Sequence, residues 1–543
     1  MSTRLANSGR LLNKGRALEF TFNGKRMTGV EGDTLASALL ANDQMMVGRS
    51  FKYHRPRGIV ASGGEEPNAL VGLGENGKFE PNQRVTTTEL FDGLTCASQN
   101  HWPSLEFDIG VINSKLSRFL PAGFYYKMFI HPRPFWKHVY EPIIRQSAGL
   151  GKAPRDRDED TYEHFYAFYD VVVIGGGVAG LQAAKSAGQA GAKVLLMEQT
   201  PHWGGRAPVD GGEVDGQPVD KVVDEIVSEL ETMDNVTLRT RMMGAGVYDH
   251  GYVMGYERVN DHQPDAKGPR HRLWRIRAGQ IVTATGAIER PISFAGNDIP
   301  GVMLASAVRD YAVNYGVSVG DRTVVVTNND DAYRTAITLK KLGLEIPVIV
   351  DARPGGAGPL AGEAVALGIR VENGKGISKV KGGKRVEGVE ICTQAGEGAA
   401  LETIKCDVVA MSGGWSPVVH LWSHCGGKLL WDDENVMFRP DEDKAPIGAD
   451  GERFVIPAGA ADGCLDLATV LDNADAAGKA AAQATGHAPA NEATPQAQPE
   501  TMAPIQAVWM MPQGANYKLR MKAWLDYQND VKVSDIQLAA REG

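Results

Sequence analysis

Residues 170–199, DVVVIGGGVAGLQAAKSAGQAGAKVLLMEQ, decide the fold of the largest part of this chain. An apolar strand at 171–174 runs into a glycine-rich turn, the turn opens an alanine-rich helix, and a second apolar strand ends at Glu198. The turn has the GxGxxG spacing, with glycines at positions 175, 177 and 180. Similar strand-to-helix patterns continue to about residue 485, which predicts a doubly wound α/β fold with a parallel sheet.

Each part of the motif has a physical reason. Gly175 permits the tight turn, Gly177 lets the backbone approach a pyrophosphate, and Gly180 lets the helix pack closely on the strand. The helix N-terminus then faces the anion. Glu198, eighteen residues after Gly180, is suited to accept hydrogen bonds from a ribose diol, and its charge disfavours the additional phosphate of NADP. The motif predicts NAD or FAD binding, and the alternative is a turn in which the glycines serve the backbone alone.

Three later segments point to the same site. HWGGR (202–206) and IVTATGAIERP (281–291) resemble marker segments of the flavoprotein superfamily with two dinucleotide-binding domains, which includes the disulfide reductases, and VIPAGAADGCLDLA (455–468) is similar to its closing segment. The resemblance implies that the backbone of Met242 meets the adenine and that Ala460 and Leu465 line the far end of the site. The expected cofactor-binding residues are Gly175, Gly177, Ala179, Gly180, Glu198, Gln199, Gly205, Arg206, Met242, Ala460 and Leu465.

A second strand-turn-helix unit, RTVVVTNNDDAYRTAITLKKLG (322–343), lacks the glycines. The residues TNNDD at 327–331 stand where a pyrophosphate would require glycines. The two carboxylates, Asp330 and Asp331, would repel a phosphate. Asp351 stands where a ribose acceptor would lie. This second domain is therefore expected to bind no dinucleotide.

Composition excludes several classes of function. The 543 residues suggest three or four domains of about 150 residues each, and a net charge of -9 argues against nucleic-acid binding. No apolar run of 18 residues and no signal-peptide core is present, so a cytoplasmic protein without a membrane span is expected. The five cysteines are far apart and form no CxxC pair, so no metal site is expected. No nucleophilic triad or paired acid/base carboxylates stand out, and no catalytic residue is assigned.

The segments GRSFKYHRPRG (48–58), TNNDDAYRTA (327–336) and WLDYQNDVKVSDIQLAAREG (524–543) carry a closer resemblance. On these residues the chain is similar, over essentially its whole length, to the α subunits of heterotetrameric sarcosine oxidases. In that family a domain shaped like a plant-type ferredoxin precedes the dinucleotide-binding domains, and a folate-binding domain resembling aminomethyltransferases follows. The sequence stops before that last domain, so a fragment, a split gene and a shorter paralogue are open alternatives, and folate chemistry is not expected of this chain.

The resemblance also implies an activity. In such a complex a β subunit oxidises sarcosine at FAD, FMN at the boundary of α and β receives the electrons, and oxygen yields hydrogen peroxide. NAD is bound by α, and small γ and δ subunits complete the assembly. Two rivals remain open: an α subunit of a related amine or amino-acid dehydrogenase acting on proline, opines or N-methylglutamate, and a stand-alone FAD or NAD oxidoreductase or a structural binding module.

The same resemblance and the changes in composition give the expected organisation. The hairpin signal Asn23-Gly24 and the helix start at Asp33-Thr34 fit the first domain. The expected divisions are a ferredoxin-like α+β domain at 1–115, an aromatic-rich connecting segment at 116–168, a dinucleotide-binding domain in two parts at 169–320 and 401–485, an inserted degenerate Rossmann-like domain at 321–400, a linker at 486–504 and a C-terminal helical segment at 505–543.

The loop 48–58 lacks the cysteines that family members such as opine oxidase subunits keep in this domain, and it reads Ser50, Lys52, Tyr53 and His54 instead. Because a cluster needs four thiolates and residues 1–95 contain no cysteine, the fold is expected without its iron-sulfur centre. YQND (527–530) stands where relatives place a second cysteine-rich motif. The loop also carries the basic residues Arg49, Lys52, Arg55 and Arg57. It would either hold a flavin phosphate or an acidic partner, or be a solvated positive loop.

Residues 124–140 hold seven aromatic residues in seventeen positions, interrupted by Pro132 and Pro134. Two interpretations are equally open, an interface for another chain or a connecting segment packed on its own protein.

Overall fold

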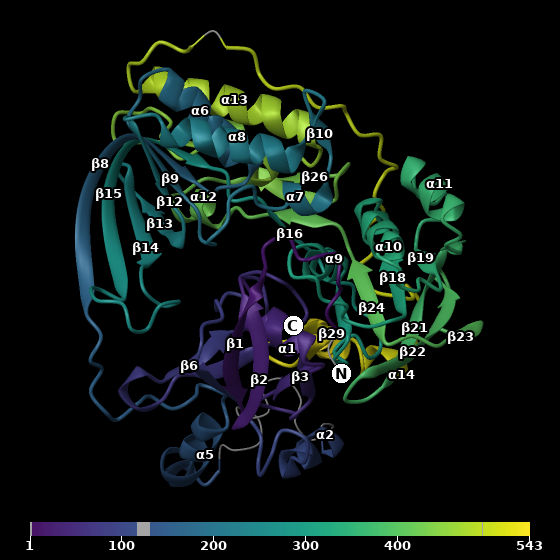
Figure 1. The fold of residues 1–543 in the computed structure, drawn as a ribbon. Coiled ribbons are helices and arrows are strands. Elements are labelled where there is room, and N and C mark those ends of the chain that lie inside the picture. Colours follow the sequence, from purple (N-terminus) through teal and green to yellow (C-terminus); the bar gives the residue numbers. More distant parts are fainter. Residues whose placement is uncertain (1–2, 117–130, 491, 543) are drawn as a thin grey trace. The chain divides into compact units, whose positions relative to one another are not determined.

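The computed structural model describes residues 3–116, 131–490 and 492–542. The chain forms two compact units, each built from separate stretches of sequence. The first comprises Met1–Glu159, Arg290–Gly414 and Ala503–Gly543, and the second comprises Asp160–Glu289 and Trp415–Met502. Figure 1 labels their helices and strands.

The second unit contains the glycine motif and is built on a seven-stranded sheet of order β12-β9-β8-β15-β14-β13, with β28 paired to β15. The pairs β12/β9, β9/β8, β8/β15 and β15/β28 are parallel, whereas β15/β14 and β14/β13 are antiparallel. The strands are β8 (Tyr162–Ile174), β9 (Val194–Met197), β12 (Val236–Arg239), β13 (Met242–Tyr248), β14 (Tyr252–Arg258), β15 (His271–Thr283) and β28 (Val455–Pro457). The parallel part of this sheet is the Rossmann-type arrangement that the sequence predicts.

Helices cover one face of this sheet (Figure 1), and the apolar face of each helix packs on it. They are α6 (Val178–Gln189), α8 (Val219–Glu231) and α13 (Leu467–Ala484). The opposite face carries a second core around Trp274 and Trp422. Smaller elements of the unit are α7 (Ala207–Asp210), β10 (Glu213–Val214), β11 (Gln217–Pro218), β16 (Ala287–Glu289), β25 (Trp415–Pro417), α12 (His420–His424), β26 (Leu429–Asp432), β27 (Met437–Pro440), η5 (Glu442–Lys444) and η6 (Gly459–Asp462).

The first unit begins with a five-stranded sheet of order β2-β1-β7-β5-β6 and helix α1. Asn23 and Gly24 both have positive φ, at 51° and 76°, which lets the two-residue turn join β1 and β2 as the sequence predicts. Thr34 caps α1 and forms a capping box with Ser37. The elements are β1 (Asn13–Phe22), β2 (Lys25–Glu31), α1 (Leu35–Ala41), β3 (Met46–Arg49), β4 (Pro56–Gly58), β5 (Leu70–Leu73), η1 (Asn76–Lys78), β6 (Glu80–Arg84), β7 (Leu94–Ser98), η2 (Ile109–Val111) and α2 (Ile112–Lys115).

The aromatic-rich stretch is described only in part, because residues 124–130 lie outside the described residues. From residue 131 it forms α4 (Arg133–Phe135), a π-helical turn η4 (Trp136–Tyr140) and α5 (Glu141–Gln146). Phe135 is 48% exposed, so at least one ring of the stretch stays outside the core of its unit.

A second parallel sheet, of order β17-β24-β18-β19-β20, completes the first unit together with a three-stranded antiparallel sheet, β21-β22-β23. One hydrophobic core joins it to the N-terminal sheet, and the Tyr311 hydroxyl donates to the carbonyl of Ala61 at 2.9 Å across that boundary. The elements are β17 (Val302–Leu304), α9 (Ala305–Val313), β18 (Thr323–Thr327), α10 (Asp331–Lys341), β19 (Ile349–Asp351), α11 (Pro359–Ala366), β20 (Val371–Asn373), β21 (Lys375–Gly382), β22 (Val386–Thr393), β23 (Glu402–Ile404), β24 (Val408–Ser412), α14 (Tyr517–Arg520), β29 (Trp524–Asp526), β30 (Val531–Lys532) and α15 (Val533–Glu542).

Candidate dinucleotide-binding site

The glycines of the turn between β8 and α6 have three different surroundings. A Cβ on Gly175 would lie 2.2 Å from the carbonyl oxygen of Ala284, and φ is +111° there. A Cβ on Gly180 would lie 1.7 Å from the carbonyl oxygen of Gly175. Gly177 differs, because the nearest atom to its Cβ position is 3.9 Å away, on Gly205. Two glycines therefore serve the packing of the turn, and the third leaves open space beside the backbone.

Helix α6 starts directly at this open glycine. Gly177 is its N-cap residue and brings no side chain to cap the first turn. The first N–H groups of the helix have no partner within it, so they and the helix dipole favour an anion at this end. Ala179 lies in this first turn and is buried. The backbone from Gly177 onward thus offers a cradle of the kind that a pyrophosphate fills.

Glu198 directly follows β9 and reaches back to the turn. Its carboxylate accepts from the N–H of Gly176 at 2.8 Å and from the N–H of Thr200 at 2.7 Å. Burial raises the pKa of this carboxyl, although the backbone N–H groups counteract that rise. Each carboxylate oxygen has more than one lone pair, so ribose hydroxyls can still donate to it. The sequence predicts that Glu198 accepts from a ribose. It does not predict that Glu198 also fixes the turn through the N–H of Gly176. The next residue, Gln199, accepts from Arg258 through its carbonyl at 2.9 Å.

The segment 202–206 lies against the turn. The N–H of Gly204 donates to the carbonyl of Gly176 at 2.8 Å, and a Cβ on Gly205 would lie 3.1 Å from the Cα of Gly177. Arg206 pairs with Asp210 at 2.8 Å and has its guanidinium 5.2 Å from the ring centre of Trp415. The structure therefore brings the two motifs together, as the sequence predicts for one site.

Met242 begins β13 next to the end of β9. Its side chain is buried, and its N–H donates to the carbonyl of Glu198 at 2.7 Å. The main chain of Met242 is thus held beside the acidic residue, and its N–H is already used within the protein. An adenine would have to meet other backbone atoms of this residue.

The closing segment lies at the start of α6. A Cβ on Gly459 would come within 2.5 Å of the Ala179 side chain, which places the 3-10 turn η6, with Ala460, beside the helix N-terminus. Leu465 follows η6 and is 38% exposed. The residues predicted for the far end of the site thus share one connection, between β28 and α13.

Sequence reasoning missed Asp462, which lies in the segment between β28 and α13. Its Oδ1 is buried and has no hydrogen-bond partner among the described residues, while Asn473 donates to Oδ2 at 2.9 Å. Burial raises the pKa of the Asp462 carboxyl to about 6. The signal was available, because GAAD (459–462) places an acidic residue two positions after Ala460. A buried carboxyl oxygen without a partner is a ready acceptor for a ligand hydroxyl or amide.

These residues fit a dinucleotide. A Cβ would fill the cradle at Gly177, Glu198 directly follows the second strand, and the unpartnered oxygen of Asp462 lies in the connection that abuts α6. Nothing in this set is a nucleophile or an acid/base pair, so the arrangement binds and orients a ligand.

The second strand-turn-helix unit is filled by the protein itself. Arg353 pairs with Asp330 and with Asp351, both at 2.8 Å, and Asp351 also accepts from the Tyr333 hydroxyl at 2.8 Å. The neighbouring Asp331 pairs with the fully buried Arg309 at 3.0 Å. The carboxylate predicted at a ribose position is therefore buried and already bonded.

The C-terminal segment seals this turn further. Asn328 donates through its side chain to the carbonyl of Gln506 at 2.6 Å, and Asp330 accepts from the N–H of Ala503 at 2.8 Å. Main chain of the protein thus lies where a second ligand would enter.

The basic loop 48–58 is not solvated. Arg49, Arg55 and Arg57 are only 3%, 4% and 3% exposed. Arg55 donates to Asp530 at 2.6 Å and to Asp298 at 3.1 Å, and Arg57 donates to the carbonyl of Gln528 at 2.7 Å. The interpretation as a solvated positive loop is therefore wrong. The loop binds residues 527–530, so two segments far apart in the sequence meet each other.

A buried carboxylate occupies the next stretch of this domain. Glu66 is 1% exposed and accepts from four backbone N–H groups at 2.7–2.9 Å. Their donors are Val60, Ala61, Asn68 and Ala69. The amides of this loop therefore converge on the carboxylate of Glu66, an anion that the chain itself supplies. The N-terminal domain has one cysteine, Cys96 on β7.

Within the described ranges, no cluster of three or more His, Cys, Asp or Glu side chains could hold a metal ion. Nor does any described helix combine the length and the apolarity needed to cross a bilayer.

Comparisons with known proteins agree with the two parts of the chain. Residues 15–101 match the 2Fe-2S iron-sulfur cluster binding domain family, and residues 169–436 match the pyridine nucleotide-disulphide oxidoreductase family. The chain is thus a ferredoxin-like domain joined to a Rossmann-type, flavoprotein-like oxidoreductase fold. More particularly, the chain is homologous over its whole length to sarcosine oxidase alpha subunits.

This assignment rests on matches along the whole chain. Sarcosine oxidase subunit alpha of Rhizobium meliloti (strain 1021) is 43% identical over 545 residues, which cover 100% of this chain and 53% of the relative. The subunit alpha of Corynebacterium sp. (strain P-1) is 34% identical, over 98% of this chain and 50% of the relative. The chain therefore spans about half the length of the curated relatives it matches.

Among solved structures, L-proline dehydrogenase from P. horikoshii is similar in fold, with a TM-score of 0.65 and 20% sequence identity. The match covers 100% of this chain and 87% of that protein. At this identity the likeness concerns the fold alone.

Proposed function

We propose that this chain is the dinucleotide-binding subunit of a sarcosine oxidase-type complex and that it holds NAD at the Gly175 turn. The observation that carries the proposal is the glycine cradle closed by Glu198, in a chain that is similar over its whole length to alpha subunits of sarcosine oxidase. Cytoplasmic location and the partner subunits β, γ and δ belong to the proposal.

Different residues bind different parts of the dinucleotide. Backbone N–H groups at the start of α6, from Gly177 through Ala179 and Gly180, bind the pyrophosphate, and Glu198 accepts from the ribose diol. The backbone at Met242 and Gln199 lies at the adenine. The remaining residues, at the phosphates and the far end, are Gly205, Arg206, Ala460, Asp462 and Leu465.

The proposed net reaction converts sarcosine, water and oxygen into glycine, formaldehyde and hydrogen peroxide. The N-methyl C–N bond loses two electrons and two protons, water then releases formaldehyde, and oxygen takes up the two electrons and two protons. Flavins supply the electron transfer when bound, FAD on the β subunit and FMN shared between β and this chain. This chain binds and positions cofactors, because none of its described site residues is placed to attack a substrate.

The experiment is to co-produce the chain with its partner subunits, purify the complex and add sarcosine under air. Equal amounts of oxygen consumed, peroxide formed and formaldehyde released are the expected result. L-Proline, N-methylglutamate and an opine serve as controls. A complex that oxidises one of these in place of sarcosine, or amine oxidation by this chain alone, would contradict the proposal.

A further inference from the structure

The outer half of β8 is an unusual strand for a protein surface. Its residues from Tyr162 to Tyr166 are all exposed, and its aromatic side chains keep much of their surface in solvent although Phe165 stacks on Trp274 at 5.0 Å between ring centres. The exposed fractions are 50% for Tyr162, 39% for Phe165, 68% for Tyr166 and 70% for Phe168. A cluster of exposed rings of this size on one strand indicates an interaction surface.

The same stretch has an open edge. Strand β8 pairs with β15 from Tyr162 to Ile174, but with β9 only from Val171 to Ile174. Within the described part of the chain, no strand pairs with the other edge between residues 164 and 168. Figure 1 shows β8 as the outer strand of the ribbon that it forms with β15, β14 and β13.

Backbone donors point out of this edge. Val171 and Gly175 donate on the β9 side, to the carbonyls of Lys193 and Met197. Amide directions alternate along a strand, but this alternation is interrupted at Asp170, whose N–H also donates to the carbonyl of Lys193. In the outer half of the ribbon, Ala278 donates to the carbonyl of Gly251 on the β14 side, so Arg277 faces β8 and its partner Phe168 faces away from β15. The N–H groups of His164, Tyr166 and Phe168 therefore point to the free side, where β9 no longer runs. An extended segment of another chain can pair with these groups, whereas an open edge rich in aromatic residues is a liability in a free protein.

Among the described residues, the edge carries cations without carboxylate partners, whereas its own carboxylates are already paired, Glu163 with Arg272 at 2.9 Å and Asp170 with His487 at 3.2 Å. Three cations lie along β15 and at the start of β9, each stacked on an aromatic ring, and none forms an ion pair with a carboxylate in the described ranges of the chain. They are Arg275 at 5.4 Å from the ring centre of Tyr166, Arg277 at 5.0 Å from that of Tyr252, and Lys193 at 4.9 Å from that of Tyr169. Carboxylates of an incoming segment would complete these sites.

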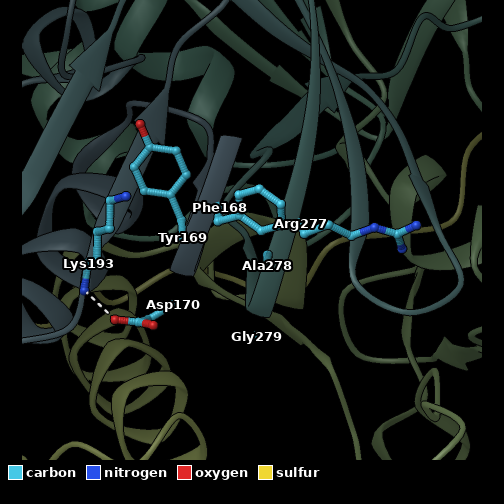
Figure 2. Close-up of a pocket in the computed structure, with 7 residues that line it drawn as sticks. All are labelled: Phe168, Tyr169, Asp170, Lys193, Arg277, Ala278 and Gly279. Carbon is cyan, nitrogen blue, oxygen red and sulfur yellow. Dashed lines mark hydrogen bonds between the residues drawn. The ribbon is translucent and has the colours of Figure 1, made fainter. Parts of the chain in front are cut away.

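A hollow of about 430 Å³ lies at the inner end of the edge, where β9 begins. Figure 2 shows Phe168 and Tyr169 beside it, with Lys193 and Arg277 on either side. Tyr169, which lines the hollow, stands six residues before Gly175 on β8, or about 20 Å away along an extended strand. The hollow is therefore separate from the dinucleotide site. One side chain of an incoming segment can enter it.

We infer that the free edge of β8, residues 164–168, is the docking site for an extended, acidic segment of a partner subunit, which adds to the sheet as a further strand. The inference rests on the proposed function, since that function supplies the partner. A second copy of this chain is a poor occupant, because pairing two such edges would bring the cations Arg275, Arg277 and Lys193 of both copies together.

The test compares backbone amide exchange at residues 164–168 in the free chain and in the complex co-produced with the partner subunits. At least about tenfold slower exchange in the complex is expected, because a paired edge protects its amides. His164→Pro removes an edge donor without touching the β15 side, and Arg275→Glu with Arg277→Glu reverses the charge. Each should weaken the subunit affinity by about tenfold or more. The matched control, Lys25→Glu with Arg26→Glu on exposed positions of β2, should leave the affinity unchanged.

A complex that forms with unprotected amides at residues 164–168, and with unchanged affinity in both variants, would overturn the inference while leaving the proposed function standing. If no complex forms at all, the proposed function and the inference fall together. Protection that appears in the chain alone as its concentration rises would identify a second copy as the occupant and would also overturn the inference.

Discussion

The guanidinium of Arg55 donates to the carboxylate of Asp530 at 2.6 Å, although the two residues are 475 positions apart in the chain. Both side chains are nearly inaccessible, with Asp530 at 0% exposure. The pair ties the loop of the N-terminal domain to the turn between β29 and β30. A buried ion pair therefore holds two distant segments of the chain together.

Asp530→Ala should destabilise the first unit by about 3 kcal/mol, because it leaves the buried charge of Arg55 without its partner. The free energy of unfolding from urea titration measures this effect. Asp43→Ala is the matched control, because it removes an ion pair with Arg385 in which both side chains are at least 40% exposed. That change should cost less than about 1 kcal/mol. Equal losses for the two variants would contradict the structural role given to Arg55 and Asp530.

Two alanine substitutions separate packing from binding in the glycine turn. Gly177→Ala adds a methyl group where the nearest atom is 3.9 Å away, so the chain should keep its melting temperature within about 2 °C and lose its bound dinucleotide. Gly180→Ala places the methyl group 1.7 Å from a carbonyl oxygen and should lower stability by about 3 kcal/mol. Nucleotide content and melting temperature are measured for both. A Gly177→Ala chain that retains its nucleotide would show that the turn does not hold the pyrophosphate.

Asp462 should give the chain a characteristic pH dependence. Its pKa is raised by burial from 3.8 to about 6, so the folded state favours the protonated carboxyl. The stability that this group contributes is therefore present at pH 4 and is lost as the pH rises through 6. Asp462→Asn should be more stable than the natural chain at pH 7.5, by on the order of 2 kcal/mol, and equally stable near pH 4. Urea unfolding at both pH values tests this, and a difference that is independent of pH would refute the assignment.

Each chain should bind one dinucleotide and no more. The second strand-turn-helix unit is filled by Arg353, Asp330 and Asp351, and ligand binding there would have to break two buried ion pairs. Calorimetric titration of the Gly177→Ala chain with NADH should show no binding. Density for NADH at Asn328 to Asp331 in a soaked crystal would contradict this expectation.

Local patterns could be predicted from the sequence because their causes are local. The glycine spacing at 175–180, the acidic residue at the end of the next strand and the Asn23-Gly24 hairpin depend on neighbouring residues, and the structure has all three. Relations between distant segments could not be predicted in this way. The loop 48–58 shows only a run of positive charge, and nothing in it indicates that Asp298 and Asp530 neutralise Arg55.

The filled second site shows the same limit. The missing glycines predicted that no dinucleotide binds, but the filling group, Arg353, lies 22 residues beyond Asp331 and has no motif of its own. Asp462 was within reach of sequence reasoning, because it stands in the closing segment beside Ala460. What made it stand out was its unpartnered oxygen, which depends on packing around η6.

The measurement that most directly tests the central claim is the identity of the nucleotide released when the purified chain is denatured, determined by chromatography and absorbance. The account predicts NAD, close to one molecule per chain, with no flavin, and none from the Gly177→Ala chain. Release of FAD would contradict the account, because the chain would then carry the redox cofactor at the Gly175 turn and would be a flavoenzyme in its own right.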